Sequence, residues 1–199
     1  MNLAPKYQDQ RSAFWQRHLE AALDYDRYLA SSDPARAAKW AAMAGKIPPL
    51  NEGQRRRLSG HGRRLQVLVY SGVWCGDCVR QGPMLQSIAA AGGPEINLRL
   101  IDRDASPELA EELRIAGGLR VPVVVFLSED CFELGRFGDR LLTVYRAKAR
   151  REFGPACDSG ITPPPEDELA AEQEEWVAIF ERMLLMLRLS PLLRERHGD

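Results

Sequence analysis

The stretch LQVLVYSGVWCGDC, which runs from Leu65 to Cys78, decides the fold of this chain. Five of its first six residues are apolar, which predicts a buried strand over residues 65–70. A short loop follows, and Cys75 and Cys78 then open a stretch that we expect to be helical to about Ala91. A strand, a loop, a Cys-x-x-Cys pair and a helix, in this order, indicate an α/β domain with chemistry at the start of the helix.

The position of the cysteine pair at a helix N-terminus favours redox chemistry. The first amide groups of a helix lack intrahelical partners and the helix dipole is positive there, so a thiolate is stabilised. We therefore expect Cys75 to be an exposed nucleophile with a lowered pKa. Cys78 lies one turn later on the same helix face, and we expect it to be the more buried thiol, which attacks the mixed disulfide and releases the product.

Three other roles are open to such a pair. A structural disulfide across so short a loop would remove only about 2 kcal/mol of unfolded-state entropy. A zinc site needs a second pair of ligands, whereas Cys131 and Cys157 lie 26 positions apart and His61 stands alone. An inert pair that the fold merely retains is the third alternative. We expect redox chemistry, with no bound cofactor and no metal.

The sequence after the first helix predicts a strand, a short helix, an antiparallel pair of strands and a further helix. A Gly-Gly-Pro sequence separates the first helix from the strand that follows. The expected bounds are 96–101 for that strand, 106–116 for the short helix, 121–127 and 131–137 for the strand pair, and 139–151 for the last helix, with Asp139 as its N-cap.

Helical patterns flank this core on both sides. Apolar residues at helical spacing predict one helix over 8–30, and Asp33-Pro34 opens a second helix that stops at Gly45. Arginines at 55–57 and 63–64 occupy the connector to the first strand, and we interpret them as a solvated face rather than a phosphate contact. Residues 166–189 predict a long helix whose apolar stripe packs on the domain or forms a homodimer interface.

The chain therefore divides into three parts by its pattern. We expect an N-terminal helical extension over 1–60, a central domain over 61–153, and a loop with a long C-terminal helix over 154–199. We expect the added N- and C-terminal helices to pack around the central domain and not to take part in the redox chemistry.

The cysteine motif and three later residues resemble a known family. Trp74-Cys75-Gly76-Asp77-Cys78 resembles the Trp-Cys-Gly-Pro-Cys active site of thioredoxins. Pro83, Val121-Pro122 and Gly138 resemble the family's helix-kinking proline, its cis-proline and the glycine that closes its substrate groove. The resemblance covers about residues 65–151. It implies a thioredoxin-like α/β fold, with a central four-stranded mixed sheet flanked by helices and with helical extensions at both ends.

The same resemblance implies an activity and a site. It makes Cys75 and Cys78 catalytic through a redox-active disulfide, and it implies reduction of protein disulfides with an unidentified electron donor as the second partner. It assigns substrate contacts to five residues: Trp74, Gly76, Asp77, Val121 and Pro122. The intact cysteines favour this enzyme over the alternative, a non-catalytic thioredoxin-like module that binds a protein partner through its added helices.

Departures from the family pattern surround the cysteines. Asp77 stands where the family has proline, and its carboxylate disfavours a neighbouring thiolate. We therefore expect a higher Cys75 pKa and a less oxidising disulfide than in a proline variant. The family's buried acid maps to Val69, which cannot transfer a proton. By topology Cys131 and Cys157 lie at the sheet end remote from Cys75, either as two independent thiols or as a remote disulfide.

Composition limits the partners. The chain has 199 residues, of which 45% are hydrophobic and 28% charged, with a formal net charge of −1. This apolar share excludes a wholly disordered chain, and the near-neutral charge gives no basis for binding nucleic acid or an anionic membrane. The polar N-terminal residues do not resemble a secretory signal, and no apolar run is long enough to span a membrane. We expect a cytoplasmic protein, in which thiols stay reduced.

Overall fold

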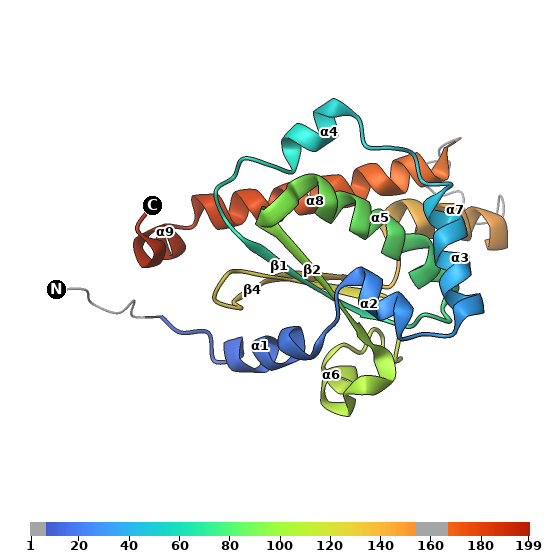
Figure 1. Ribbon diagram of the computed structural model, residues 1–199, viewed down its shortest axis with the longest axis horizontal. Coiled ribbons are helices and arrows are strands. Elements are labelled where there is room, and N and C mark those ends of the chain that lie inside the picture. The colour runs from blue at the N-terminus through green and yellow to red at the C-terminus, as the bar shows by residue number, and fades with distance from the viewer. Residues whose placement is uncertain (1–6, 154–166) are drawn as a thin grey trace.

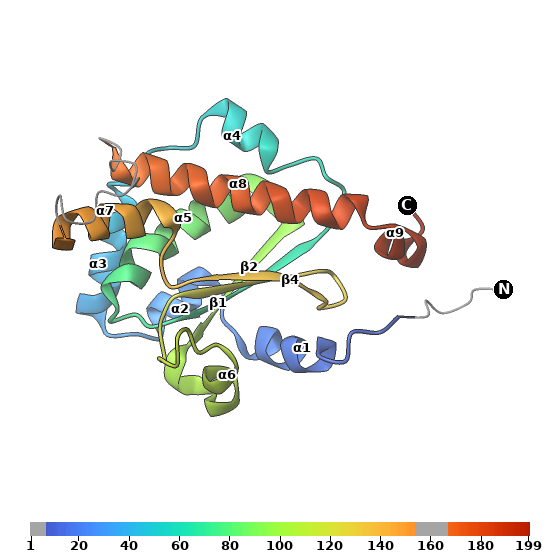
Figure 2. The same cartoon turned by 180° about the vertical axis from the view of Figure 1, so that it is seen from behind.

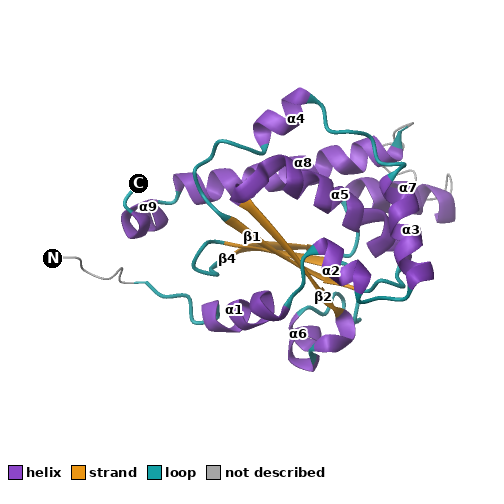
Figure 3. Ribbon diagram, in the orientation of Figure 1, coloured by secondary structure: helices purple, strands orange, loops and turns teal. Residues whose placement is uncertain are grey.

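The computed structural model describes residues 7–153 and 167–199. Its centre is a four-stranded mixed sheet, drawn in orange in Figure 3, with the order β2-β1-β3-β4. The strands are β1 (Leu65–Ser71), β2 (Ile96–Asp102), β3 (Val123–Leu127) and β4 (Glu133–Gly138). β1 runs parallel to β2 and antiparallel to β3, and β3 pairs with β4 as an antiparallel hairpin. The expected four-stranded mixed sheet is confirmed.

Helices enclose this sheet. In chain order they are α1 (Ser12–Ala21), α2 (Tyr25–Ala30), α3 (Pro34–Ala44), α4 (Glu52–Arg57), α5 (Gly76–Gly92), α6 (Pro107–Glu112), α7 (Leu142–Phe153), α8 (Glu168–Leu189) and α9 (Pro191–His197), with short 3-10 turns η1 (Gly93–Glu95) and η2 (Arg103–Ala105). Figures 1 and 2 show α5 and α8 on one side of the sheet and α1 and α6 on the other. Within the two described ranges, no helix is long and apolar enough to cross a membrane.

One hydrophobic core joins the sheet to helices from both ends of the chain. Every residue of β1 is buried, because the strand has a neighbour on each side and helices over its faces. Three tryptophans are almost fully buried around it, namely Trp15, Trp40 and Trp176. Trp40 packs directly on α5, where a Cβ added at Gly82 would lie 2.0 Å from the indole Cζ3. Only glycine permits this approach, so α3 and α5 are fitted to each other.

The N-terminal segment differs from the single helix predicted over residues 8–30. It forms α1 and α2, which are separated by a short extended segment. Leu23 in that segment exchanges two backbone hydrogen bonds of 2.7 and 2.8 Å with Leu100 of β2. Asp24 then caps α2 by accepting a hydrogen bond from the Arg27 N–H. Pairing with the outer edge of β2 therefore interrupts the helix and covers part of an open strand edge.

The helix after β4 also differs from its prediction. α7 begins at Leu142, and Asp139 is not its N-cap. The carboxylate of Glu175 on α8 instead accepts hydrogen bonds of 3.0 Å from the backbone N–H groups of Leu142 and Thr143. A cap that a distant helix supplies leaves no local signal, which is why the nearest aspartate was a misleading candidate.

The long helix α8 packs its apolar stripe on the domain. Its buried residues include Trp176, Phe180, Met183, Leu184 and Leu187. The Phe180 ring meets Phe126 of β3 edge to face, with 5.0 Å between ring centroids. Leu185, Met186 and Leu189 lie on the exposed side of the same helix.

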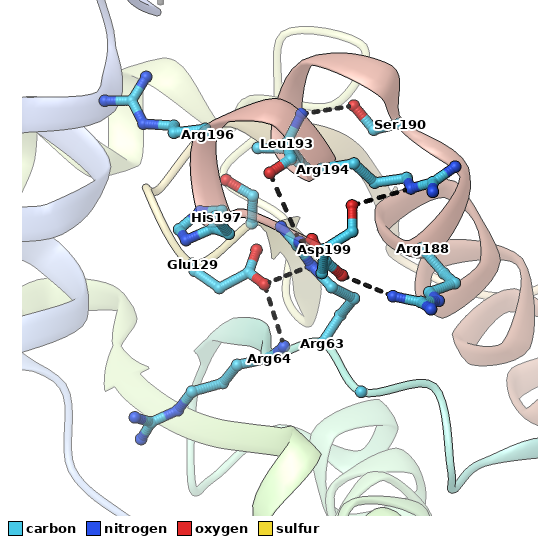
Figure 4. A network of polar contacts seen from close by, with 12 residues as sticks. Arg63, Arg64, Glu129, Arg188, Ser190, Leu193, Arg194, Arg196, His197 and Asp199 are labelled. Carbon is cyan, nitrogen blue, oxygen red and sulfur yellow. Dashed lines mark hydrogen bonds and ion pairs between the residues drawn. The ribbon is translucent and has the colours of Figure 1, made fainter. Parts of the chain in front are cut away.

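At the start of β1, an ion-pair cluster holds the last residues of the chain (Figure 4). The Arg63 side chain is only 2% exposed, and its Nε lies 2.7 Å from Glu129 Oε1. Its Nη1 lies 2.5 Å from Asp199 Oδ1, so one guanidinium joins the β3–β4 turn to the segment after α9. The expectation of a solvated arginine face is therefore wrong for Arg63, although Arg56 on α4 is indeed exposed.

The two solitary cysteines were expected at this same sheet end. Cys131 lies in the turn after β3, where its backbone N–H donates to the Ser128 carbonyl. β3 begins beside Pro122 and ends at Leu127, so this turn is at the end of the sheet remote from Cys75. Cys157 falls outside the described residues.

Candidate active site

Cys75 and Cys78 lie where β1 passes into α5. Cys75 is the N-cap residue of the helix and is partly exposed, whereas the Cys78 side chain is only 1% exposed. The Gly72 N–H donates a 3.4 Å hydrogen bond to Cys78 Sγ, which fixes the loop over the buried thiol. A Cβ at Gly72 would lie 2.8 Å from the Trp74 ring, so a side chain there would displace the indole. Both cysteines are free thiols.

The two thiols differ sharply in acidity. The pKa of Cys75 is lowered to about 6, first by the hydrogen bond from the Cys78 thiol and then by the backbone N–H groups of Cys78 and Asp77. Partial burial and the Asp77 carboxylate oppose this lowering. Burial, together with the hydrogen bond and the charge of Cys75, raises the pKa of Cys78 far above its ordinary value. At neutral pH the pair therefore holds a thiolate at Cys75 and a proton on Cys78.

The segment before β3 faces this pair. The Val121–Pro122 peptide bond is cis, as expected, and the Cys75 thiol contacts the Val121 carbonyl oxygen at 3.5 Å. The sheet register pairs Val123 of β3 with Tyr70 of β1 on one side and with Gly138 of β4 on the other. These ends of the three strands therefore lie side by side next to the cysteines. A Cβ at Gly138 would lie 2.6 Å from the Pro122 carbonyl oxygen, which explains why a glycine ends β4.

Trp74 and Gly76 form the exposed surface beside Cys75. The Trp74 side chain is 44% exposed, and the Arg103 guanidinium stacks over its ring at 4.6 Å from the centroid. A side chain at Gly76 would meet nothing within 4 Å, so the space outside the helix N-terminus is open. Cys75 is therefore accessible from this side.

A charged cluster, absent from the sequence prediction, surrounds Asp77. Arg140 pairs with Asp77, and its Nη1 lies 3.1 Å from Asp139 Oδ2. Asp139 is 3% exposed and also binds Arg120 and the Tyr145 hydroxyl. The sequence did contain a signal for this cluster. In the predicted hairpin the end of the second strand lies beside the start of the first, so the residues directly after Gly138 lie next to Pro122.

The sequence had placed two further residues near the cysteines. Val69 is buried in β1, as the position of an apolar residue in a central strand requires. Pro83 lies inside α5 and is buried. Across residues 7–153 and 167–199, no group of three or more His, Cys, Asp or Glu side chains is arranged to hold a metal ion.

Comparison with known proteins fits this geometry. A thioredoxin family model matches residues 22–148, which include both cysteines and the whole sheet. The chain belongs to the thioredoxin family. The matched region of this thioredoxin-family protein begins at residue 22, so it includes α2 and α3 as well as the sheet. No curated protein matches the sequence.

Two solved structures resemble this thioredoxin-family protein over most of its length. A protein of unknown function from Pseudomonas aeruginosa is 20% identical, with a TM-score of 0.65, and the alignment covers 85% of this chain and 96% of that one. An HIV epitope scaffold is 21% identical, with a TM-score of 0.57, and the alignment covers 92% of this chain and 98% of that one. At this identity the likeness concerns the fold, including the added helices.

Proposed function

We propose that this protein is a thiol–disulfide oxidoreductase that reduces disulfide bonds in protein substrates. The observation that carries the proposal is the asymmetry of the pair, a Cys75 thiol with its pKa lowered to about 6 in front of the buried, protonated Cys78. At pH 7 a thiol with that pKa is roughly 90% thiolate, which is the reactive form. Membership of the thioredoxin family supports the same chemistry.

The reaction proceeds in two exchanges. The Cys75 thiolate attacks one sulfur of the substrate disulfide, forms a mixed disulfide and releases the other substrate sulfur as a thiolate, which takes up a proton. Cys78 then loses its proton and attacks Cys75 Sγ, so the second substrate thiolate leaves and a Cys75–Cys78 disulfide forms. Two electrons have passed to the substrate, and an external dithiol donor returns them to the protein.

The surroundings of Cys75 suit an extended peptide. Once Cys75 is a thiolate it has no proton to donate, so the Val121 carbonyl is free to accept a hydrogen bond from a substrate backbone N–H. Pro122 holds this carbonyl beside the cysteine, while Trp74 and Gly76 offer exposed surface next to it. Asp77 is held by Arg140, so it shapes the rim of the site and adjusts the charge near Cys75.

Reduction of insulin disulfides by dithiothreitol, followed by turbidity, tests the proposal. We expect the wild type to accelerate the reaction and the Cys75→Ser variant to lose the acceleration. Cys131→Ser is the matched control, because it removes a cysteine at the far end of the sheet, and it should keep the wild-type rate. A wild type that does not accelerate reduction would overturn the proposal in favour of a non-catalytic module that binds a partner.

A further inference from the structure

A cavity adjoins the loop that carries Trp74 and Cys75. Its volume is about 420 Å³, which is in the range of sites for small ligands. Val73, the residue before Trp74, lines this cavity. The Arg103 guanidinium stacks over the Trp74 ring, and Asp102, directly before Arg103, also lines the cavity. The cavity therefore begins beside the stacked pair of Trp74 and Arg103, next to the nucleophile.

The N-terminal helices enclose this cavity. It lies at the carboxyl ends of the parallel strands β1 and β2, where ligand sites of α/β sheets are commonly found. α2 lies beside the end of β2 (Figure 1), and most of the lining residues precede β1. The lining combines apolar residues with polar ones; the apolar residues include Ala21, Leu23, Val73, Leu100 and Ile101, and the polar ones are Ser31, Ser32, Asp33, Arg36 and Asp102.

The two serines of the lining present hydrogen-bond acceptors. The Ser31 hydroxyl donates its proton to the Tyr28 carbonyl at 2.9 Å, and the Ser32 hydroxyl donates to the Leu29 carbonyl at 2.6 Å. A hydroxyl has one proton and two lone pairs, so each Oγ can still accept but has no further proton to give. A ligand beside these serines must therefore bring the donor.

Two carboxylates add further acceptors and a negative charge. Asp33 Oδ1 accepts from the Ala35 and Arg36 N–H groups, at 2.9 and 3.2 Å. Asp102 Oδ1 accepts from the Asp104 N–H at 2.9 Å. Among the described residues, no hydrogen bond reaches Oδ2 of either carboxylate. The Arg36 side chain is exposed, so solvent screens its charge, and the lining carries one net negative charge.

We propose that this cavity binds a lysine or arginine side chain of the protein substrate while Cys75 attacks the substrate disulfide. Such a side chain has an apolar stem, which suits Leu23 and Leu100, and a cationic head rich in donors, which suits Asp33 and Asp102. Glutamate or aspartate in the substrate would meet like charge instead.

The cavity is within reach of a residue close to the reacting cysteine of the substrate. Consecutive Cα atoms are about 3.8 Å apart, so the Cα atoms of Val73 and Cys75 are at most about 8 Å apart, and three residues of extended substrate cover this span. The inference rests on the proposed function, since it concerns the substrate of that reaction. It gives the N-terminal helices a part in substrate selection.

Peptide disulfides that differ in one side chain test the proposal. Each substrate is a disulfide-linked peptide dimer in which lysine occupies one of the positions two to five residues from the cysteine. The matched substrate has norleucine there, which keeps the stem and lacks the charge. Reduced protein without added reductant is mixed with each substrate, and acid quenching followed by chromatography measures the released peptide thiol. At the best position we expect lysine to raise the second-order rate constant about fivefold over norleucine. Glutamate should lower it.

Substitutions that keep the backbone contacts isolate the charge of the cavity. Asparagine caps a helix as well as aspartate does, so Asp33→Asn and Asp102→Asn retain an oxygen for their N–H partners. In the double variant the ratio of the lysine rate to the norleucine rate should fall to about one. Asp167→Asn is the matched control, because Asp167 caps α8 through the Ala170 N–H and does not line the cavity. It should keep the fivefold ratio.

The possible failures are distinguishable. Equal rates with lysine and norleucine at every position, or a lysine preference that persists in the double variant, would overturn the proposed subsite and leave the dithiol chemistry intact. Butylamine that shifts the amide resonances of Asp33 and Asp102, without any lysine preference, would assign the cavity to a free amine and also overturn it. A wild type that reduces none of the peptides would contradict the proposed function, and the subsite with it.

Discussion

Asp77 and Arg140 form a two-pronged ion pair beside Cys75, with 2.5 Å between Oδ2 and Nη2 and 3.1 Å between Oδ1 and Nε. Asp77 belongs to the first turn of α5 and Arg140 follows β4, so the pair ties the helix N-terminus to the hairpin. The Asp77 charge raises the pKa of Cys75, and the guanidinium offsets part of that charge. The acidity of the nucleophile is thus adjusted by a residue that lies 63 positions away from Asp77.

Removing Arg140 should make Cys75 less acidic. In Arg140→Gln the Asp77 carboxylate is left without its cation, and we expect the thiolate fraction of Cys75 at pH 6 to fall by roughly half. The thiolate absorbance in the ultraviolet measures this fraction. Asp77→Asn with Arg140→Gln should restore the wild-type value or exceed it, and a double variant as weakly ionised as Arg140→Gln alone would show that Asp77 is not the cause.

Replacing Asp77 by proline should shift the redox properties of the pair. Asp77→Pro removes the negative charge, so we expect a lower Cys75 pKa and a disulfide that is more oxidising than in the wild type. Equilibration with glutathione buffers gives the reduction potential. If neither the thiol pKa nor the potential changes, the charge of Asp77 has no part in setting them.

Alkylation should report the two thiols separately. With its pKa lowered to about 6, Cys75 should react with iodoacetamide at a rate that reaches half its maximum near pH 6. Cys78 should stay unmodified over the same range, because burial raises its pKa and blocks access. Mass spectrometry of the labelled peptide identifies the modified cysteine. A midpoint near the ordinary thiol value of 9.0 would contradict the assignment.

The same acidity links the stability of the reduced protein to pH. The Cys75 pKa is about 6 in the folded chain and near 9.0 in the unfolded chain, so between these values the unfolded state holds the extra proton. The stabilising contribution is therefore fully present above pH 9.0, and it is lost as the pH falls through 6. Urea unfolding of the reduced wild type and of Cys75→Ser should show a stability difference that moves in favour of the wild type as pH rises. A difference that is independent of pH over this range argues against a lowered pKa.

Arg63 should contribute to the stability of the fold and not to the disulfide reduction. Arg63→Met leaves Glu129 and Asp199 without their cation at the sheet end remote from Cys75 and Cys78, and we expect a loss of about 1–3 kcal/mol in the free energy of unfolding. Arg56→Met is the control, because its pair with Glu52 is exposed and should contribute less than about 1 kcal/mol. Insulin reduction below the melting transition should be unchanged in both. Equal stability of the two variants would contradict the role given to Arg63.

The elements that the sequence predicted correctly are those that residues close together in the sequence determine. β1, the cysteine pair and α5 follow from a largely apolar run, a helix start and a glycine loop, all within residues 65–92. Asp33-Pro34 marks the start of α3 correctly because an N-cap acts over a few residues. The cis bond before Pro122 was anticipated from a resemblance, since no local energy term makes that isomer the favoured one.

The parts that it missed depend on contacts between distant segments. Leu23 leaves its helix to pair with Leu100, and Glu175 caps a helix that begins 33 positions earlier. The buried Arg63 looks like any surface arginine until Glu129 and Asp199 are placed around it. The sequence does not single out Tyr28, and only the fold packs its ring against Trp40 of α3.

Trapping of the mixed disulfide tests the central claim most directly. In Cys78→Ser the first exchange can occur but the second cannot. Incubation with native, disulfide-bonded insulin should therefore give a stable adduct on Cys75 that dithiothreitol releases. Mass spectrometry of the adduct identifies the linked cysteine. We predict an adduct on Cys75 in Cys78→Ser and none in the Cys75→Ser, Cys78→Ser double variant. The absence of an adduct, or an adduct on Cys131 instead, would contradict the assignment of Cys75 as the nucleophile.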